Sequence, residues 1–368
     1  MNQKLNILIC PLEWGLGHAA RMIPVAVHLR QMDHNVIIAA GEEHLNLFRE
    51  ELPDLSTINF PGFKPGYSRY LPQYVVLLLK IPVLLIHIAK EHSKLKRIIS
   101  EHSVDVVISD NRFGLWNRNI RTVYITHMPR IPFPRPFRFL EFTGVILHRA
   151  IIRKYSFCFI PDLPGEINFS GRLSHNVRLP ENVRFIGILS RFTVAGKTPC
   201  PDPSVFEHNT VILSGPEPQK SIFKEKVLNF LEDEKIITLL LEAKPGRGNE
   251  IARSGNFAFC SHLPSGEMQK MIATSRKIIA RAGYSSIMEL ASLNKNALIV
   301  PTPGQTEQEY LASYLSAKGW FSTCTQGKLK KGFDHVPAGS SLPPQLTAMS
   351  NILLDAALKE LLQYHHRE

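Results

Sequence analysis

Cysteine is scarce in this chain of 368 residues, and the five that occur are scattered along it. No two of them form a C-x-x-C pair, which argues against a disulfide framework or a zinc ribbon and fits a reducing cytoplasm. Long apolar runs are also missing. The strongest one, residues 74–88, contains Lys80 and Pro82 and is shorter than the about 20 residues that a membrane-spanning helix needs. No secretory signal is visible, because residues 4–10 read as a first β-strand.

Acidic residues are in short supply only in the first half of the chain. Residues 1–199 hold 25 Lys and Arg against 15 Asp and Glu, whereas residues 200–368 hold 18 against 17. The block 112–154 carries nine basic residues and one acid, Glu141. Such a field favours an anionic partner, with a merely solvated basic face as the alternative. Because no nucleic-acid-binding motif accompanies it, we expect a membrane surface or a phosphorylated substrate and no nucleic acid.

Apolar residues accompany this basic charge in two places. Residues 131–140 read Ile-Pro-Phe-Pro-Arg-Pro-Phe-Arg-Phe-Leu, and residues 74–88 form an apolar stretch that leads into a basic one. The stretch 74–88 is either a buried core helix or a helix that lies in the membrane interface, with the basic residues that follow it reaching the headgroups. The chain is therefore expected in the cytoplasm, at the inner face of the membrane if it associates with one.

Strand and helix patterns alternate along the chain, which predicts parallel sheets covered by helices. Strands are expected at 5–10, 35–40, 104–109, 122–126, 157–160 and 183–188, with helices at 20–31, 42–50 and 73–99. The pattern restarts at 210, after a linker over 191–209 that is rich in proline around 198–203. We predict an α/β fold of two doubly wound, Rossmann-like domains, 1–190 and 210–340, facing a cleft. A final helix within 341–368 is expected to pack back across the domains.

A glycine turn follows the first predicted strand and opens a helix. Gly15 and Gly17 permit a tight turn and close approach of a ligand to backbone N–H groups, although the turn lacks the third glycine of a dinucleotide-binding fingerprint. His18 is a candidate general base, with helix capping or simple packing as the alternative. Asp110 ends a neighbouring strand candidate and could orient that histidine, or cap the next segment. His127 ends the strand after it and is a rival base or an acceptor contact.

The second half carries polar residues at three strand ends, where ligands bind in open α/β sheets. A helix N-terminus offers free N–H groups to a diphosphate. Glu289 lies one helical turn after the serines and could accept the ribose hydroxyls or form a capping box with Ser286. The candidate residues are Ser214 and Gly215 after the first strand, Arg281, Gly283, Ser285, Ser286 and Glu289 after the second, and Gln305, Glu307, Gln308 and Glu309 after the third. No metal-ligand cluster is apparent.

This second half resembles the C-terminal domain of GT-B glycosyltransferases of the MurG type, the family 28 glycosyltransferases. The resemblance rests on residues 281–289 and 301–309, with Ala312 and Gly319 beyond, and the Gly15–His18 turn is similar to the glycine loop of that family. It implies that Gly283, Ser285, Ser286 and Glu289 hold the diphosphate and ribose of a nucleotide sugar, most simply a UDP-sugar. It also implies that Gln308 and Glu309 touch the donor sugar. The second of these is glutamine in the family, which opens the question of which sugar is used.

The resemblance implies an inverting, metal-independent hexosyl transfer without a cofactor. His18, oriented by Asp110, would deprotonate an acceptor hydroxyl, while Arg281 and helix N-termini stabilise the departing diphosphate. The donated sugar would be an N-acetylhexosamine and the acceptor lipid-linked or otherwise close to the membrane. Two other functions fit the same residues: a nucleotide-sugar hydrolase of the same fold, and a non-catalytic nucleotide-sugar-binding protein.

Overall fold

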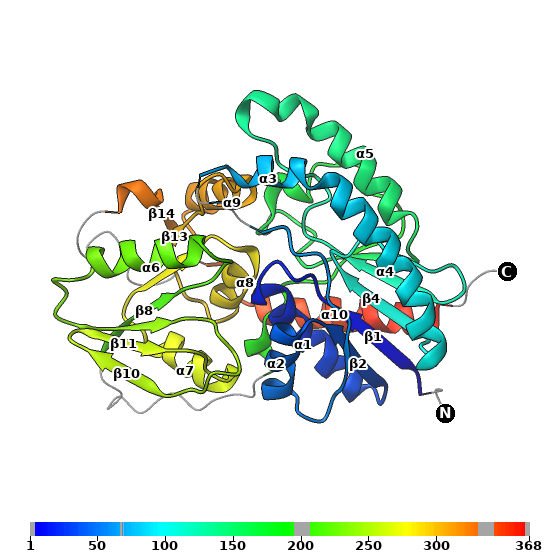
Figure 1. Ribbon diagram of the computed structural model, residues 1–368, viewed down its shortest axis with the longest axis horizontal. Coiled ribbons are helices and arrows are strands. Elements are labelled where there is room, and N and C mark those ends of the chain that lie inside the picture. The colour runs from blue at the N-terminus through cyan, green and yellow to red at the C-terminus, as the bar shows by residue number, and fades with distance from the viewer. Residues whose placement is uncertain (1–3, 67, 69, 195–206, 330–341, 365–368) are drawn as a thin grey trace.

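The structure, a computed structural model, describes residues 4–66, 68, 70–194, 207–329 and 342–364. Two β-sheets of seven strands each form the two lobes visible in Figure 1, with helices alternating between the strands. The predicted α/β architecture of two doubly wound domains is confirmed. The proline-rich centre of the expected linker, with Cys200, lies outside the described residues.

The first sheet is parallel throughout and has the order β3-β2-β1-β4-β5-β6-β7. Its strands are β1 (Asn6–Cys10), β2 (Asn35–Ala40), β3 (Ser56–Asn59), β4 (Val106–Asp110), β5 (Arg121–Ile125), β6 (Phe157–Ile160) and β7 (Val183–Phe185). The central strands are runs of buried, largely β-branched residues, as expected where helices cover both faces of a sheet. Strand order reverses between β1 and β4, so the carboxyl ends of these two strands flank the crevice in which such sheets bind ligands.

Helices connect these strands and cover the sheet. They are α1 (Leu16–Gln31), α2 (Glu42–Glu51), α3 (Gln73–Leu79), α4 (Ile81–Glu101) and α5 (Glu141–Ile152), with the short 3-10 helices η1 (Arg135–Leu140), η2 (Gly171–Leu173) and η3 (Arg191–Thr193). The prediction of a single helix over 73–99 is wrong in one respect. It is two helices that meet at Lys80 with a bend of 64°. Pro82 explains the break, because it lacks an N–H group and its ring clashes with the preceding turn.

The second sheet has the order β10-β11-β9-β8-β12-β13-β14, with only β10 antiparallel to its neighbour. Its strands are β8 (His208–Ile212), β9 (Ile237–Leu241), β10 (Ile251–Ser254), β11 (Phe257–Cys260), β12 (Ile278–Arg281), β13 (Leu298–Val300) and β14 (Ser322–Thr323). The helices are α6 (Gln219–Phe230), α7 (Ser265–Thr274), α8 (Tyr284–Ser292), α9 (Thr306–Ala317) and the 3-10 helix η4 (Gln326–Lys328). Here the order reverses between β8 and β12, which again marks a binding crevice.

Helix α10 (Leu346–Gln363) returns from the second lobe to the first. Its start belongs to the second lobe, where Leu346 joins the apolar core and Thr347 bonds to the carbonyl of Ser292. Its end belongs to the first lobe, where Leu358 and Leu361 are fully buried. The helix thus ties the lobes together and is seen in Figure 1 as the red helix that runs behind α1 and β1.

Candidate active site

Three polar residues meet at the crevice of the first sheet. His18 lies in the first turn of α1, and its Nδ1 is 2.8 Å from Oδ2 of Asp110 at the end of β4. Arg21, one helical turn later, is fully buried and donates through Nε and Nη2 to both oxygens of Asp110. The expected neighbourhood of His18 and Asp110 is present because β1 and β4 pair directly, with Cys10 opposite Ser109.

The charges of this triad are set by burial and by each other. Burial raises the pKa of Asp110, but Arg21 and His18 outweigh that effect and bring it to about 2. Burial lowers the pKa of His18, and Arg21 lowers it further, while Asp110 acts in the opposite direction. At neutral pH the site therefore holds a carboxylate, a guanidinium and an uncharged imidazole. The imidazole can accept a proton.

The tautomer of His18 decides which ring nitrogen is basic. Nδ1 lies 2.8 Å from both the Asp110 carboxylate and Nη2 of Arg21. Of these two groups only the carboxylate can accept a proton. When Nδ1 carries the proton it donates to Asp110, and Nε2 keeps its lone pair for a substrate hydroxyl.

His127 follows β5 and joins the two lobes. Its Nε2 is 2.8 Å from Oε1 of Glu307, at the start of α9, and its ring stacks on Tyr284 with the centroids 3.9 Å apart. Burial raises the pKa of Glu307, but His127 outweighs burial and holds that pKa below its ordinary value. Nδ1 of His127 is buried and has no hydrogen-bond partner among the described residues. His127 is thus part of the contact between the two crevices.

The two glycine turns predicted from the sequence face each other. Helices α1 and α8 meet at the junction of the lobes (Figure 1). A β-carbon on Gly17 would stand 2.9 Å from both Cβ and Oγ of Ser285, closer than side chains pack. Gly15 caps α1 with φ of 133°, a conformation that favours glycine. Both glycines are therefore required, one by the turn and the other by the approach of the second lobe.

The turn after β12 is bordered by polar groups of the next loop. A β-carbon on Gly283 would stand 3.9 Å from Nε2 of Gln308 and 4.0 Å from Oγ of Ser286. Gln308 is buried, and its Oε1 accepts the N–H group of Thr302. The structure thus brings together Gly283, Ser286 and Gln308 at the N-terminus of α8. Ser214 and Gly215 follow β8, the strand that pairs with β12, so this turn lies at the same edge of the sheet.

Arg281 differs from expectation, because it does not extend into the crevice. It is fully buried, stacks on the ring of Phe223 and donates to the carbonyl oxygens of Gln219 and Pro301. Burial lowers its pKa to about 9. These bonds satisfy carbonyls at the ends of neighbouring elements, so Arg281 supports the loops around the crevice instead of offering N–H groups to a diphosphate.

Glu289 is buried and its Oε1 accepts a hydrogen bond of 2.9 Å from Nε of Arg191. Burial raises the pKa of Glu289, and Arg191 acts against this. The alternative of a capping box with Ser286 is wrong, because Gly283 caps α8 and no side chain caps that helix. The carboxylate therefore already has one partner within the protein, at the boundary between the lobes.

The polar residues that follow β13 differ in exposure: some are buried and others face solvent. Glu309 is exposed, and its Oε1 accepts the N–H group of Gly304. Gln305 is the N-cap of α9 and makes no capping bond with its side chain. Of the two residues expected to touch a donor sugar, only Gln308 lies against the turn after β12.

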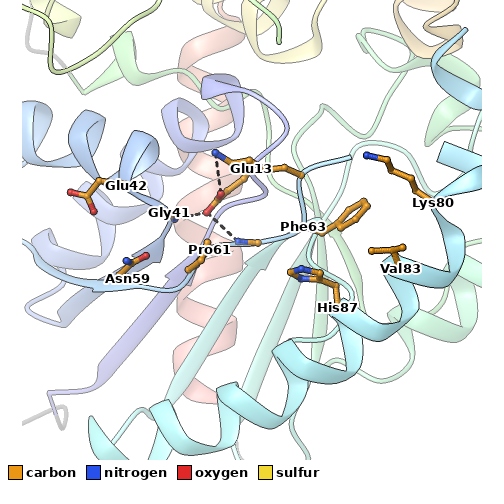
Figure 2. Close-up of a pocket in the computed structure, with 11 residues that line it drawn as sticks. Glu13, Gly41, Glu42, Asn59, Pro61, Phe63, Lys80, Val83 and His87 are labelled. Atoms are coloured by element: carbon orange, nitrogen blue, oxygen red, sulfur yellow. Dashed lines mark hydrogen bonds and ion pairs between the residues drawn. The ribbon is translucent and has the colours of Figure 1, made fainter. Parts of the chain in front are cut away.

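A cavity of about 580 Å³ opens beside the glycine turn of the first lobe, at the ends of β1, β2 and β3 (Figure 2). Glu13 lies in its wall, where Oε1 accepts the N–H groups of Gly41 and Gly62. Its Oε2 is buried without a hydrogen bond, with Nζ of Lys64 3.6 Å away. Lys80 and His87 line the opposite wall. The carboxylate of Glu13 is thus held by the protein itself and fixes the loops that form the cavity wall.

Among the described residues, no group of three or more His, Cys, Asp or Glu is arranged to hold a metal ion. The four described cysteines are free; Cys10, Cys158 and Cys260 are buried, and Cys324 is half-buried.

Several residues of the site carried no sequence signal that would have found them. Arg21 and Tyr284 lie in helix faces that read as packing surfaces. Glu307 is among the residues expected at the second crevice, but the sequence gives no sign that it binds His127, which is 180 residues away. Glu13 lies one residue before the tryptophan that opens the glycine turn, and only the folded loop gives it its buried position.

Comparison with known proteins supports the architecture. Residues 263–332 match the model of the glycosyltransferase family 28 C-terminal domain, a segment that includes the turns after β12 and β13. No curated protein sequence matches the chain.

The fold is similar to that of several solved GT-B glycosyltransferases, over nearly the whole length of both chains. The glycosyltransferase SnogD from Streptomyces nogalater has a TM-score of 0.56 at 15% identity, with 98% of this chain and 93% of that chain covered. The spinosyn rhamnosyltransferase SpnG has a TM-score of 0.59 at 13% identity, with 97% and 95% covered. The glycosyltransferase VinC, solved in complex with dTDP, has a TM-score of 0.53 at 13% identity, with 98% and 94% covered. At such identities the likeness establishes a GT-B fold.

Proposed function

We propose that this protein is a glycosyltransferase that moves a hexosyl group from a nucleotide-diphosphate donor to an acceptor hydroxyl. One observation carries the proposal: the first turn of α1, with His18 bound to Asp110, meets the first turn of α8, with Gly17 packed on Ser285. A base in one lobe is thus held opposite a helix N-terminus of the other. The match of residues 263–332 to the family 28 domain supports the assignment of that second turn to the donor.

The acceptor hydroxyl is activated by His18. Nε2 takes the hydroxyl proton as the oxygen attacks the anomeric carbon, and the bond from that carbon to the diphosphate oxygen breaks. Asp110, ionised at any pH above about 2, stabilises the imidazolium that forms. Direct displacement of this kind inverts the anomeric configuration. In this scheme the base and the leaving group lie on opposite lobes.

The departing diphosphate is stabilised by the backbone N–H groups of α8, with the hydroxyls of Ser285 and Ser286 beside them. In this mechanism the leaving group is stabilised without a metal ion. Gln308 lies next to Gly283 and would donate to the donor through Nε2. Glu289 keeps one oxygen for the ribose while Arg191 holds the other. We assign the donor as a UDP-sugar on the family resemblance. Structures of SpnG and VinC contain a different nucleotide, thymidine diphosphate (dTDP).

The acceptor belongs to the first lobe. Its cavity of about 580 Å³ shares the loop after β1 with the glycine turn, and the carboxylate of Glu13 forms part of its wall. Lys64 and Lys80 line this cavity together with Glu13 and Glu42, and Lys64 pairs with Glu13 and Glu43, so the lining is polar and balanced in charge. We propose, on the family resemblance, a lipid-linked acceptor whose polar head reaches this cavity.

Donor binding is tested with a panel of nucleotide sugars, read as shifts in the thermal melting of the purified protein. A donor at 100 times its Kd stabilises the folded state by about 2.7 kcal/mol. We expect UDP-sugars to raise the melting temperature, and Gln308→Ala to reduce that shift while Glu309→Gln leaves it unchanged. No shift with any nucleotide sugar would contradict the donor assignment.

Turnover is tested by nucleoside-diphosphate release with and without an extract of membrane lipids. The proposal predicts release only with the extract. Rapid stoichiometric release without it would identify a hydrolase, and binding without release under either condition would identify a non-catalytic binding protein.

A further inference from the structure

Large apolar side chains are exposed on two neighbouring segments of the first lobe. Of the seventeen such residues exposed in the described chain, thirteen lie within 70–86 or 137–147. The first set is Tyr70, Leu71, Leu78, Leu79, Ile81, Val83, Leu85 and Ile86; the second is Phe137, Phe139, Phe142, Ile146 and Leu147. The first set refutes the alternative of a buried core helix at 74–88. Concentrated exposure of this kind marks a surface that contacts something else.

The two segments meet at the same loop of the second lobe. A β-carbon on Gly304 would stand 3.0 Å from Pro72, just before α3, and the hydroxyl of Thr306 donates to the carbonyl of Pro132, just before η1. Figure 1 shows α3 and α5 on the same side of the molecule. Since Thr306 and Gln308 lie in the first turn of α9, directly after this loop, the apolar surface adjoins the proposed donor site. We call it the apolar face.

Positive charge surrounds the apolar face. Exposed basic residues follow its first segment along α4 and flank its second: Lys90, Lys94, Lys96, Arg97, Arg138, Arg153, Lys154 and Arg178. The acids of the two segments are paired within the protein. Glu91 binds Arg112, Glu101 binds Arg97 and Glu141 binds Arg172. Arg97 is thereby neutralised and Arg138 lies 4.0 Å from Glu141, but the other basic residues leave the border of the face with an excess of positive charge.

A second cavity lies within this border. It has a volume of about 450 Å³ and combines the side chains of Arg130, Arg138 and Arg178 with those of Phe139, Phe142 and Ile146. Glu141 also lines it and is paired with Arg172, so the three arginines leave the lining positive. Guanidinium groups bind phosphate through paired N–H donors, and the apolar residues line the same opening. Such a lining fits the head of an anionic phospholipid whose chains continue along the apolar face.

The helices of the face are placed to lie along a membrane. No described helix is long and apolar enough to cross a bilayer by itself; α3 and α4 reach that length and composition only together, with their 64° bend. The second half of α4 is fixed to the lobe, because Glu91, Leu95 and Ile98 are buried. Only its first half and α3 are free to enter lipid, to the depth of the interface.

We propose that the apolar face docks the protein on an anionic lipid bilayer, with the cavity at η1 and α5 holding a phospholipid headgroup. Docking brings the donor loop to the bilayer surface, where the acceptor proposed above would be found. The inference concerns this surface and its partner, and it is tested without turnover. Loss of the proposed activity would leave it standing.

The test is co-sedimentation with vesicles of phosphatidylcholine, with or without phosphatidylglycerol. We expect binding to the anionic vesicles and little to the neutral ones. Leu79→Glu and Phe139→Glu should each weaken binding at least tenfold. Ile352→Glu, at an equally exposed apolar residue of α10, is the matched control and should bind as the unaltered protein does.

The headgroup cavity is tested by the double variant Arg138→Gln, Arg178→Gln. Each charge near an anionic surface changes affinity about fivefold, so the pair should lose about 25-fold. The pair Arg247→Gln, Arg253→Gln removes the same charge from the second lobe and should lose little.

Equal binding by Leu79→Glu, Phe139→Glu and the Ile352→Glu control would overturn the proposal, as would equal binding to neutral and anionic vesicles. Sedimentation without lipid measures the oligomeric state and tests whether a second copy of the chain covers the face. A stable dimer that Phe139→Glu dissociates, together with no vesicle binding, would show that a second copy covers the face.

Discussion

At the scale of single residues, the site is organised by buried charges that hold one another. Asp110 has no exposed surface, and it is stabilised by Arg21 and His18 on one turn of α1. Burying an unpaired carboxylate costs several kcal/mol of folding free energy. Asp110 can therefore be ionised in the core only because Arg21 and His18 are there to pair with it. The consequence for catalysis is that Arg21 competes with His18 for Asp110 and keeps the imidazole weakly basic.

The competition predicts the pH dependence of an Arg21 variant. Arg21→Met removes a charge that lowers the pKa of His18, so the acid limb of kcat/KM should move to higher pH. Arg21→Lys retains the charge and should leave that limb near its original position. Circular dichroism checks that both variants are folded, because losing a buried pair costs about 3 to 5 kcal/mol. An unmoved limb in a folded Arg21→Met protein would exclude this influence.

A second residue-scale prediction concerns stability. Burial lowers the pKa of His44 to about 3, with further lowering by His18 and Lys64. The unfolded chain therefore binds a proton near pH 6.5 that the folded protein does not take up until about pH 3. Stability falls as pH decreases through that window, by about 1.4 kcal/mol per pH unit.

Urea unfolding at pH 7 and pH 5 measures this effect. His44→Gln should lose about 2 kcal/mol less than the unaltered protein between these two pH values. The exposed His102→Gln serves as the control and should follow the unaltered protein. Parallel losses in all three proteins would show that His44 does not contribute.

At the scale of elements, the sequence predicted those strands that are buried on both faces. Their continuous apolar runs are typical of central parallel strands. It did not predict β3, which reads Ser-Thr-Ile-Asn, β10, whose four residues are all exposed, or β14, which has two residues. These are edge strands or short strands, whose pairing depends on neighbours and not on local pattern. Helix α5 was missed for a similar reason, since its apolar side chains face outward.

The candidate site divides in the same way. The contact of His18 with Asp110 could be predicted, because the ends of adjacent parallel strands converge. The burial of Arg281 against Phe223 and the bond of Glu289 to Arg191 could not, because each depends on how distant segments pack. Residues that look available for a ligand in a sequence are, in these two cases, held by the protein itself.

Helices α1 and α8 carry an element-scale prediction. Gly17→Ala places a methyl group against Ser285 and separates the two turns, so turnover should fall by about 100-fold, as expected for a displacement near 1 Å. Gly266→Ala is the matched control, since Gly266 is also the second residue of its helix and faces open space. Assays of turnover and of donor binding should separate the two variants. Unchanged turnover in Gly17→Ala would show that this approach is not needed for catalysis.

At the scale of the whole molecule, the lobes are joined by polar contacts on both sides of the crevices. On one side His127 binds Glu307 and Thr306 binds the carbonyl of Pro132. On the other, Arg191 pairs with Glu289 and lies 3.6 Å from Glu51 at the end of α2. Both ends of the cleft are thus fixed by residues from each lobe, which sets the distance between base and donor turn.

The two buried ion pairs of Arg191, with Glu289 and Glu51, allow fold stability and donor affinity to be tested separately. Glu289→Ala leaves the guanidinium with fewer partners and should destabilise the fold by about 3 kcal/mol. If Glu289 also holds the ribose, the variant loses donor affinity at temperatures where it is fully folded. Glu51→Gln weakens the same cluster from the first lobe and should lower stability without changing donor affinity. Donor affinity equal in the folded Glu289→Ala and unaltered proteins would remove its ribose role.

The central claim is that His18 of the first lobe activates an acceptor for a donor held by the second. The most direct test compares His18→Ala with the unaltered protein for release of nucleoside diphosphate from a nucleotide sugar in the presence of membrane lipids. Donor binding is followed in parallel by thermal shift. The account predicts that His18→Ala binds the donor as before and releases nucleoside diphosphate at least 100 times more slowly. Equal rates of release in the two proteins would contradict it.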